Sequence, residues 1–347
     1  MFLQFIFLTF SKIMRSKLFK LLRISGYDLV GLGIISNNDD ISSLNAFFED
    51  DNKSGFYLKN KQLQNIFVKS LSDALELVQI LNHSDFLIIN NSMFSKKDLV
   101  KIGEYAENRG VFIYELINEN NTSLLAGLIK NIKIGPINIV KKRRLPVKHS
   151  INVINKRIFD FIFSLTFLIT IFWWLYIIIS TIIKFQSKGP VLFKQKRVGI
   201  DGEVFTCYKF RTMHLDVTNS KKITQIGDKR IFSFGNFMRK TNLDEFPQFI
   251  NVFNGDMSVV GPRPHMVEED KMLEKEIDKY RMRRWVKPGI TGYAAMKGFR
   301  GGTESMKLMQ KRIDLDVEYI EKWNFLLDLK ICYDTFMEIV LLRKKGH

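Results

Sequence analysis

The feature that most constrains this chain is a run of 23 residues without a charged side chain, from Phe161 to Ile183. As a straight helix the run would be about 34 Å long, enough to cross a hydrocarbon core of about 30 Å. A buried helix of a water-soluble protein is rarely apolar on every side. The sequence therefore predicts a helix at residues 161–183 that enters a membrane.

Basic residues stand on both sides of this run, with Lys156 and Arg157 before it and Lys184 directly after it. Positive residues beside a membrane helix tend to stay on the cytoplasmic side. The pair Trp173-Trp174 lies in the middle of the run, although such side chains favour the membrane interface. We therefore expect a re-entrant helix, which dips into the membrane and returns, in preference to a spanning one; the sequence leaves both open.

The chain carries a formal net charge of +17, so its partners are expected to be anions. Nucleic acid is not favoured as a partner, because no aromatic platform interleaved with basic residues is present. Anionic lipids and phosphorylated small molecules remain. The two cysteines, Cys207 and Cys332, have no His or Cys at metal-ligand spacing, which fits a reduced, cytoplasm-facing protein.

A chain of 347 residues is long enough for two domains. Residues 1–20 form an apolar and basic segment, interpreted as a peripheral anchor or a truncated remnant. Residues 21–145 are predicted to form a Rossmann-like α/β domain that is similar to a nucleotide-binding domain but has a degenerate binding fingerprint. Residues 146–347 read as a mainly α, membrane-associated catalytic domain that contains the apolar helix.

One βαβ unit is predicted within residues 21–145, with strands at 85–90 and 111–114 and a helix at 96–108. The glycine-rich segment Gly31-Leu-Gly33 lacks the third glycine and the following acidic residue of a dinucleotide fingerprint. A packing or regulatory domain is therefore favoured over one that binds a cofactor.

After Gly189-Pro190 the chain predicts short strands at 191–193 and 204–208, followed by amphipathic helices such as 246–253 and 319–342. These helices mix large apolar residues with Lys and Glu. That pattern fits helices that lie on a membrane surface and equally fits ordinary core-facing helices.

Two adjacent carboxylates, Asp244 and Glu245, follow two cations and precede Pro247. Because proline is tolerated in the first helical turn, the pair is expected at the N-terminus of a helix. Taken alone, the segment also fits a capping box from Thr241 to Asp244.

Three basic clusters surround this pair in the sequence. Arginine offers a planar fork for phosphate oxygens, and the glycine and prolines around Arg263 predict a stiff loop. Several such clusters within about seventy residues favour a phosphate-binding site over a merely solvated surface. The clusters are Lys194-Gln-Lys-Arg-Val-Gly199, Lys209-Phe-Arg211 and Gly261-Pro-Arg-Pro264.

The order of motifs from Lys156 to Asp334 resembles the bacterial sugar transferases, also called monotopic phosphoglycosyl transferases. Residues 298–301 and 316–323 are similar to the subgroup that loads glucose-1-phosphate onto undecaprenyl phosphate. The main motifs are Lys156-Arg-Ile-Phe-Asp160, Gln195-Lys-Arg-Val-Gly199, Tyr208-Lys-Phe-Arg-Thr-Met213, Leu243-Asp-Glu-Phe-Pro-Gln248, Val260-Gly-Pro-Arg-Pro264 and Lys287-Pro-Gly-Ile-Thr-Gly292.

The resemblance implies a two-step reaction. Asp244 would attack the sugar-bearing phosphate of a UDP-sugar, release UMP and hold the phosphosugar until undecaprenyl phosphate collects it. Glu245 would hold Mg²⁺, which screens the phosphate charge. The substrate-binding residues implied are Gln195, Arg197, Lys209, Arg211 and Arg263.

The implied location is the bacterial inner membrane, with the active site on its cytoplasmic face, and the implied product is the first lipid-linked intermediate of an exopolysaccharide, capsule or O-antigen. The resemblance leaves the sugar and the oligomeric state open. Two other functions stay open: a basic peripheral membrane scaffold with a nucleotide-sensing domain, and direct sugar transfer that releases UDP.

The chain departs from the family pattern at two places. The family helix bends at a proline, and Phe172-Trp-Trp-Leu175 has none, so a bend would depend on Ser164, Thr166 or Thr170 bonding to the helix backbone. Ala295 stands where related sequences usually carry glutamine, which bears on sugar preference.

Overall fold

The computed structural model describes residues 32–35, 70–81, 86–117, 131–134, 137–141, 145–148, 150–214, 228, 230–299 and 305–340. The chain divides into two compact units, residues 1–143 and 144–347. The segment predicted at residues 1–20 lies outside the described residues.

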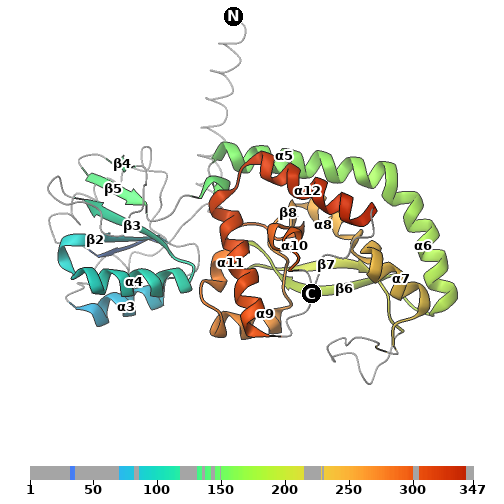
Figure 1. Ribbon diagram of the computed structural model, residues 1–347, viewed down its shortest axis with the longest axis horizontal. Coiled ribbons are helices and arrows are strands. Elements are labelled where there is room, and N and C mark those ends of the chain that lie inside the picture. Colours follow the sequence, from blue (N-terminus) through green and yellow to red (C-terminus); the bar gives the residue numbers. More distant parts are fainter. Residues whose placement is uncertain are drawn as a thin grey trace, which may run out of the picture. The chain divides into compact units, whose positions relative to one another are not determined.

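The N-terminal unit is built on a mixed five-stranded sheet of order β1-β2-β3-β5-β4. The first three strands are parallel, whereas β5 runs antiparallel to both β3 and β4 (Figure 1). The βαβ unit predicted from the sequence is confirmed by β2, α4 and β3. The elements are β1 (Leu32–Ile35), α3 (Leu71–Ile80), β2 (Phe86–Asn90), α4 (Lys96–Asn108), β3 (Phe112–Ile117), β4 (Asn131–Ile134) and β5 (Ile137–Lys141).

Helix α4 shows why this unit follows its sequence closely. Ser95 caps its N-terminus by accepting from the Asp98 amide at 3.2 Å. Leu99, Ile102 and Ala106 then recur at helical spacing, and all three are fully buried against the sheet. The unit is therefore α/β as predicted, while its Rossmann-like character stays a prediction.

The C-terminal unit is mainly helical and contains two small two-stranded sheets, β6-β7 antiparallel and β8-β9 parallel. Its elements are α5 (Ser150–Phe167), η4 (Leu168–Phe172), α6 (Trp173–Gln186), β6 (Leu192–Val198), β7 (Val204–Phe210), α7 (Ser233–Thr241), η6 (Leu243–Glu245), α8 (Gln248–Asn254), β8 (Ser258–Val260), α9 (Val267–Glu276), η7 (Tyr280–Trp285), β9 (Gly289–Thr291), α10 (Tyr293–Met296), α11 (Met306–Lys322) and α12 (Phe325–Val340), with short 3₁₀ turns at Pro146–Lys148 and Ile200–Gly202.

Two predicted elements of this unit differ from the structure. The strands expected at 191–193 and 204–208 continue to Val198 and Phe210. The helix expected at 319–342 is two helices, because α11 ends at Lys322 and α12 begins at Phe325. Residues 341 and 342 lie outside the described residues.

The apolar helix bends where α5 meets α6. The five residues of η4 form a π-helical turn there, and Figure 1 shows α6 leaving in a different direction from α5. Thr170 Oγ1 donates to the Thr166 carbonyl at 2.7 Å, and Trp174 Nε1 donates to the Thr170 carbonyl at 2.8 Å. Side chains that bond to helix carbonyls distort the i to i−4 ladder, so the bend forms without a proline.

Both ends of the bent helix are bonded to the rest of the C-terminal unit. At the α5 end, Lys156 Nζ contacts Asp328 Oδ2 at 2.6 Å and donates to the Val260 carbonyl at 3.0 Å. At the α6 end, Gln186 Oε1 accepts from the Phe234 amide at 3.0 Å. The two ends of α5–α6 are thereby held by the same folded unit.

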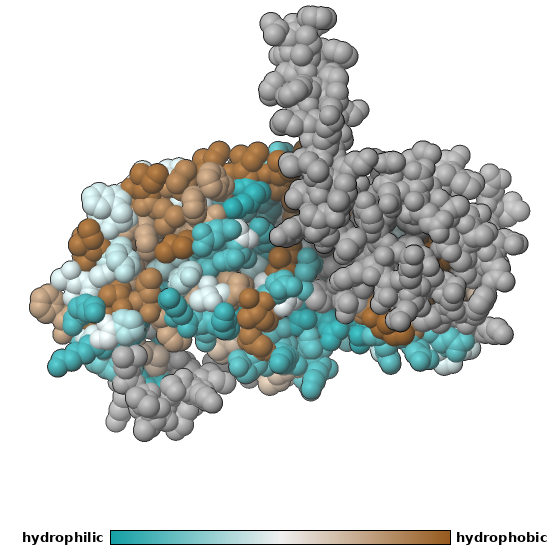
Figure 2. Space-filling view, turned by 180° about the vertical axis from the view of Figure 1, so that it is seen from behind, coloured by the Kyte–Doolittle hydropathy of each residue, from teal (hydrophilic) through white to brown (hydrophobic). Residues whose placement is uncertain are grey.

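The outward face of α5 and α6 is apolar. The helix Ile151–Gln186 is long and apolar enough to cross a membrane by length and composition, and only 17% of its most apolar window is buried. Ile162 and Trp173 are 57% and 59% exposed. Apolar residues gather along the edge of the unit where these helices lie (Figure 2). Exposed apolar surface of this extent marks a membrane or protein contact.

Candidate active site

The Asp244-Glu245 pair lies on η6, between α7 and α8. Helix α7 ends because Asn242 takes a left-handed conformation with φ of 57°, after which the chain turns into η6 and, past Pro247, into α8. The sequence predicted the pair at the N-terminus of a helix; it lies on the 3₁₀ turn η6, and Phe246 and Pro247 separate it from the first residue of α8. The capping-box alternative is wrong, because Thr241 Oγ1 donates back to the carbonyls of Phe237 and Met238.

The η6 turn packs against the apolar helix through the side chains on either side of the carboxylate pair. Leu243 and Phe246 pack against the core cluster that α6 shares with β7 and α7. The Phe246 ring also meets the Phe167 ring of α5 edge to face, with centroids 5.2 Å apart. The carboxylate pair is thus fixed directly against the long apolar helix.

Glu245 is held by two cations. Its Oε1 accepts from Lys209 Nζ at 2.6 Å and from Arg263 Nη2 at 2.7 Å, and its Oε2 accepts from Arg263 Nη1 at 3.2 Å. Although burial alone would raise it, the charges of Arg263 and Lys209 hold the pKa of Glu245 below its usual range. Glu245 therefore stays ionised.

Asp244 has a different environment from its neighbour. Burial, followed by the charge of Glu245, raises the pKa of Asp244 to about 6. Lys209, Arg239 and Arg263 oppose this rise. Among the described residues, no hydrogen bond occupies the Asp244 carboxylate. The pair thus consists of one carboxylate fixed by two cations and one with its oxygens available.

Lys209 is positioned by the packing of β7 on α8. Asn251 of α8 is fully buried, and it bonds to the β7 backbone by accepting from the Tyr208 amide at 3.1 Å and donating to the Thr206 carbonyl at 2.7 Å. Lys209 follows directly and reaches Glu245. A buried amide that satisfies two backbone groups fixes the strand opposite the carboxylate pair.

Arg263 comes from the loop of residues 261–266 after β8. The loop needs glycine at Gly261, since a Cβ there would lie 2.4 Å from the Lys287 carbonyl oxygen. The Arg263 side chain is 40% exposed, so part of its guanidinium faces solvent while it contacts Glu245. The charge of Glu245 raises the pKa of Arg263 further above its usual range.

Gln195 and Arg197 contact this loop. Arg197 Nη1 donates to the Pro264 carbonyl, and Gln195 Nε2 contacts Met266 Sδ at 2.8 Å. Gln195 Oε1 accepts from Arg197 Nη2 at 2.8 Å. Both residues predicted to bind substrate therefore brace the Arg263 loop from the β6 side.

Arg211 uses its donors elsewhere in the fold. It is 3% exposed, and its guanidinium donates to the carbonyls of Ser187, Lys188 and Pro190 and to the Ser187 hydroxyl. These bonds hold the segment that follows α6. The structure brings Lys209 and Arg263 to the carboxylate pair and assigns Arg211 these backbone contacts instead.

Arg239 is one of the two cations that precede the pair in the sequence, and sequence reasoning gave it no role in the site. It lies in the last turn of α7, and its Nε donates to Thr212 Oγ1 at 2.8 Å. Burial lowers the pKa of Arg239, and the nearby charge of Asp244 is the largest effect that raises it. The signal for such a role was its position in the sequence, five residues before Asp244.

A comparison of the chain with protein families shows the family to which it belongs. Residues 151–342, more than half of the chain, match the model of the bacterial sugar transferase family. The chain belongs to the bacterial sugar transferase family. Every residue of the site described above lies within the matched residues.

Several curated relatives share this bacterial sugar transferase region. A UDP-glucose:undecaprenyl-phosphate glucose-1-phosphate transferase of Xanthomonas campestris pv. campestris is 33% identical over 82% of this chain and 54% of its own length. A protein of the same name from Escherichia coli K12 is 46% identical over 45% of this chain and 34% of its own length. One from Caulobacter vibrioides is 40% identical over 52% of this chain and 68% of its own length. The chain thus spans about half or less of the first two of these relatives.

The carboxylate oxygens of Asp244 and Glu245 fit a Mg²⁺ site only if a phosphate group supplies further ligands. Mg²⁺ is usually bound by one or two carboxylates, with substrate phosphates and water completing the octahedron. Asp244 and Glu245 supply two carboxylates, and no group of three or more metal-binding side chains occurs among the described residues. Glu245 already accepts three hydrogen bonds. One lone pair of Glu245 and the oxygens of Asp244 therefore remain to coordinate a metal ion.

Proposed function

We propose that this chain transfers a hexose-1-phosphate, glucose-1-phosphate in the first instance, from a UDP-sugar to undecaprenyl phosphate and releases UMP. The observation that carries the proposal is the Asp244 carboxylate with its oxygens available, beside Glu245 and within the field of Lys209, Arg239 and Arg263. The names of the relatives support the same substrates.

In the first step, a carboxylate oxygen of Asp244 attacks the sugar-bearing phosphorus. The bond from that phosphorus to the bridging oxygen breaks, and UMP leaves with the electron pair. Arg263 and Lys209 lie where the negative charge of the diphosphate must be accommodated, and arginine binds phosphate oxygens in a bidentate way. The product is a phosphosugar bound to Asp244.

In the second step, a phosphate oxygen of undecaprenyl phosphate attacks the same phosphorus. The acyl phosphate bond breaks, which restores the Asp244 carboxylate and leaves a lipid-linked diphosphosugar. The contact between Phe246 and Phe167 supports access of a lipid phosphate to Asp244, because it places the η6 turn against the apolar helix.

Mg²⁺ belongs to the proposal as an ion that Glu245, with the help of the Asp244 oxygens, would hold together with the diphosphate. When bound, it would screen the charge between the carboxylate and the phosphates. Glu245 keeps its orientation through Lys209 and Arg263, which are bonded to it without the metal.

A re-entrant path for α5–α6 is also part of the proposal. A spanning helix separates its two ends by the hydrocarbon core of about 30 Å. Lys156 at one end and Gln186 at the other are bonded to the same folded unit, and the π-turn bends the helix between them. These contacts support entry and return on one face, which we assign to the cytoplasmic side from the basic flanks.

The test is a transfer assay with the full chain in mixed micelles, UDP-glucose, undecaprenyl phosphate and Mg²⁺. We expect UMP release and a labelled lipid product. Asp244→Asn should lose at least a thousandfold in turnover, whereas the control Asp314→Asn, at an exposed carboxylate of α11, should match the wild-type chain.

The released nucleotide separates the competing functions. UDP instead of UMP would establish direct sugar transfer, and lipid binding without any nucleotide release would establish a scaffold. Near-normal turnover of Asp244→Asn would show that another group is the nucleophile.

A further inference from the structure

The loop of residues 261–266 is held from behind by a second arginine, Arg283 of η7. Arg283 is 5% exposed, and its Nη2 donates to the Arg263 carbonyl oxygen at 2.6 Å. The same guanidinium contacts Asp316 Oδ2 of α11 at 3.0 Å from Nη2 and 3.2 Å from Nε. Arg283 therefore connects the backbone of Arg263 to a buried carboxylate on another helix.

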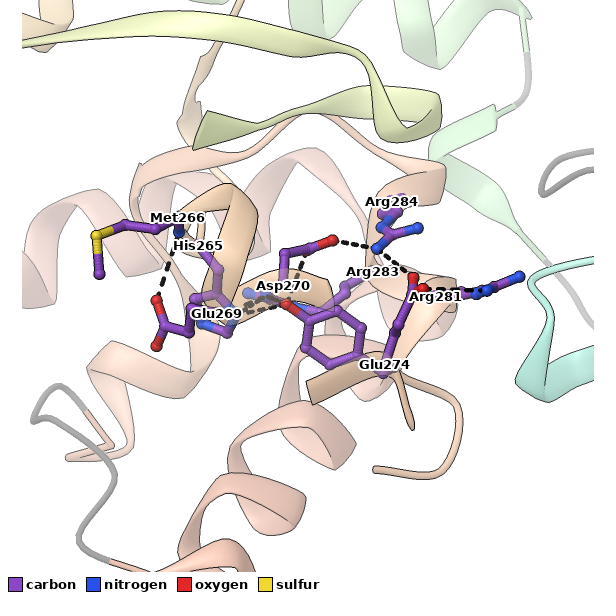
Figure 3. A network of polar contacts seen from close by, with 9 residues as sticks. His265, Met266, Glu269, Asp270, Glu274, Arg281, Arg283 and Arg284 are labelled. Atoms are coloured by element: carbon purple, nitrogen blue, oxygen red, sulfur yellow. Dashed lines mark hydrogen bonds and ion pairs between the residues drawn. The ribbon is translucent and has the colours of Figure 1, made fainter. Parts of the chain in front are cut away.

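The third nitrogen of Arg283 bonds to the next polar side chain of the loop. Its Nη1 lies 2.8 Å from Nδ1 of His265, and since a guanidinium can only donate, this ring nitrogen accepts. The Tyr280 hydroxyl lies 2.6 Å from the same nitrogen and 2.8 Å from Asp270 Oδ1. Figure 3 shows His265, Asp270 and Arg283 gathered in this network. His265 is therefore neutral and fixed in place.

Two elements thus hold the loop from opposite sides. On the β6 side, Arg197 bonds to the Pro264 carbonyl, and the Val198 amide donates to the His265 carbonyl at 3.1 Å. On the η7 side, only Arg283 bonds to Arg263 itself among the described residues. The Arg263 side chain is long and 40% exposed, so its placement depends on where its backbone is fixed.

We propose that Arg283 is a positioning residue of this site: it fixes the Arg263 carbonyl and the His265 ring together, and thereby sets where the Arg263 guanidinium meets the diphosphate. The inference rests on the proposed function, because the diphosphate is the ligand that Arg263 serves in it. A displacement of about 1 Å in such a group can cost about a hundredfold in rate.

The ion pair with Asp316 does not by itself explain this arrangement. A lysine at position 283 could neutralise Asp316, but its single nitrogen could not also reach both the Arg263 carbonyl and the His265 ring. Arg283→Lys therefore separates the stability of the buried pair from the position of the loop.

The test measures UMP release and thermal stability of Arg283→Lys. We expect turnover at least tenfold below that of the wild-type chain. The chain should stay folded with a modestly lower melting temperature, since the Asp316 pair is kept while the Arg263 carbonyl and His265 Nδ1 lose a buried donor. The matched control is Arg284→Lys, since Arg284 lies in the same turn and bonds to Asp270 and Glu274 but not to residues 261–264. Its turnover should stay within twofold of the wild-type value.

A double-variant cycle distinguishes positioning from general damage. In an Arg263→Met background, Arg283→Lys should lower the residual turnover by less than twofold, because the residue that it positions is gone. An equal loss in both backgrounds would overturn the proposal.

Hydrogen exchange gives a readout that needs no turnover. The Val198 amide, which donates to His265, should exchange at least tenfold faster in Arg283→Lys and at the wild-type rate in Arg284→Lys. If the wild-type chain releases no UMP, the proposed function fails and this exchange rate alone decides the positioning claim. Unchanged protection of Val198 would overturn that claim.

Discussion

Replacing Lys156 by methionine tests whether the buried bond between α5 and α12 stabilises the C-terminal unit. Lys156 and Asp328 form an ion pair at 2.6 Å, with side chains that are 9% and 0% exposed. Removing one partner of a buried pair leaves an unpaired charge, which costs about 3–5 kcal/mol. The Tyr319 hydroxyl and Trp323 Nε1 still donate to Asp328 at 2.8 and 3.0 Å, so we expect the lower end of this range.

A loss of about 3 kcal/mol corresponds to a fall in melting temperature of roughly 6–12 °C for a unit of this size. The assay is thermal unfolding in mixed micelles, followed by tryptophan fluorescence, since Trp323 lies at the perturbed site. The control is Lys322→Met, because the Lys322–Glu318 pair is a surface pair with the lysine 71% exposed. Such pairs contribute little, so no measurable change is expected there.

A second variant removes the unpaired charge. Lys156→Met combined with Asp328→Asn should recover most of the lost stability, because no buried charge is left without its partner. A melting temperature of Lys156→Met equal to that of Lys322→Met would refute this account of how α5 is anchored.

Four further outcomes are expected. UMP release should fall as the pH drops through about 6, because burial and Glu245 raise the pKa of Asp244 to about 6 and the protonated acid cannot attack; a plateau down to pH 5 would contradict this. Arg263→Met should lower turnover by at least a hundredfold while the chain stays folded, measured by UMP release beside a circular dichroism spectrum. Gly261→Ala should lower the melting temperature, since its Cβ would lie 2.4 Å from a backbone carbonyl oxygen; an unchanged value would mean that the loop can move aside. Cysteines at Asn155 and at the exposed Lys188 should react with an impermeant thiol reagent from the same side of sealed vesicles, and reaction from opposite sides would require a spanning helix.

The parts of the fold that the sequence predicts well are those with strong local signals. Helix α4 has the predicted bounds because a serine cap and a regular apolar face coincide. Strand β6 was predicted too short, because the charged residues Lys194, Lys196 and Arg197 leave no regular alternation of apolar and polar residues after Phe193. The break at Trp323-Asn324 was missed because the apolar pattern continues through it.

The candidate site could be predicted where the sequence combines unusual charge with a helix signal, as at Asp244 and Glu245, two adjacent carboxylates just before Pro247. The sequence cannot say which cations reach the pair, because that depends on which of their donors the fold already uses. Lys209 lies on β7 and contacts Glu245. Arg211, the first residue after β7, instead donates to carbonyls of the segment that follows α6. The bend was only partly predictable: Thr170 was named as a residue that could distort the helix, but Thr181 makes the same kind of bond to the Ile177 carbonyl within α6.

The bond from Lys156 to the Val260 carbonyl has a consequence for the lipid surroundings. Val260 is the last residue of β8, and the arginine loop begins at the next position. If α5 enters a membrane as proposed, a change in bilayer thickness that altered its tilt would also act on β8, the strand that precedes the Arg263 loop. If the proposed function holds, we expect turnover to depend on acyl-chain length, because Lys156 and Asp160 both join α5 to β8: Asp160 accepts from the Ser258 hydroxyl and the Val259 amide.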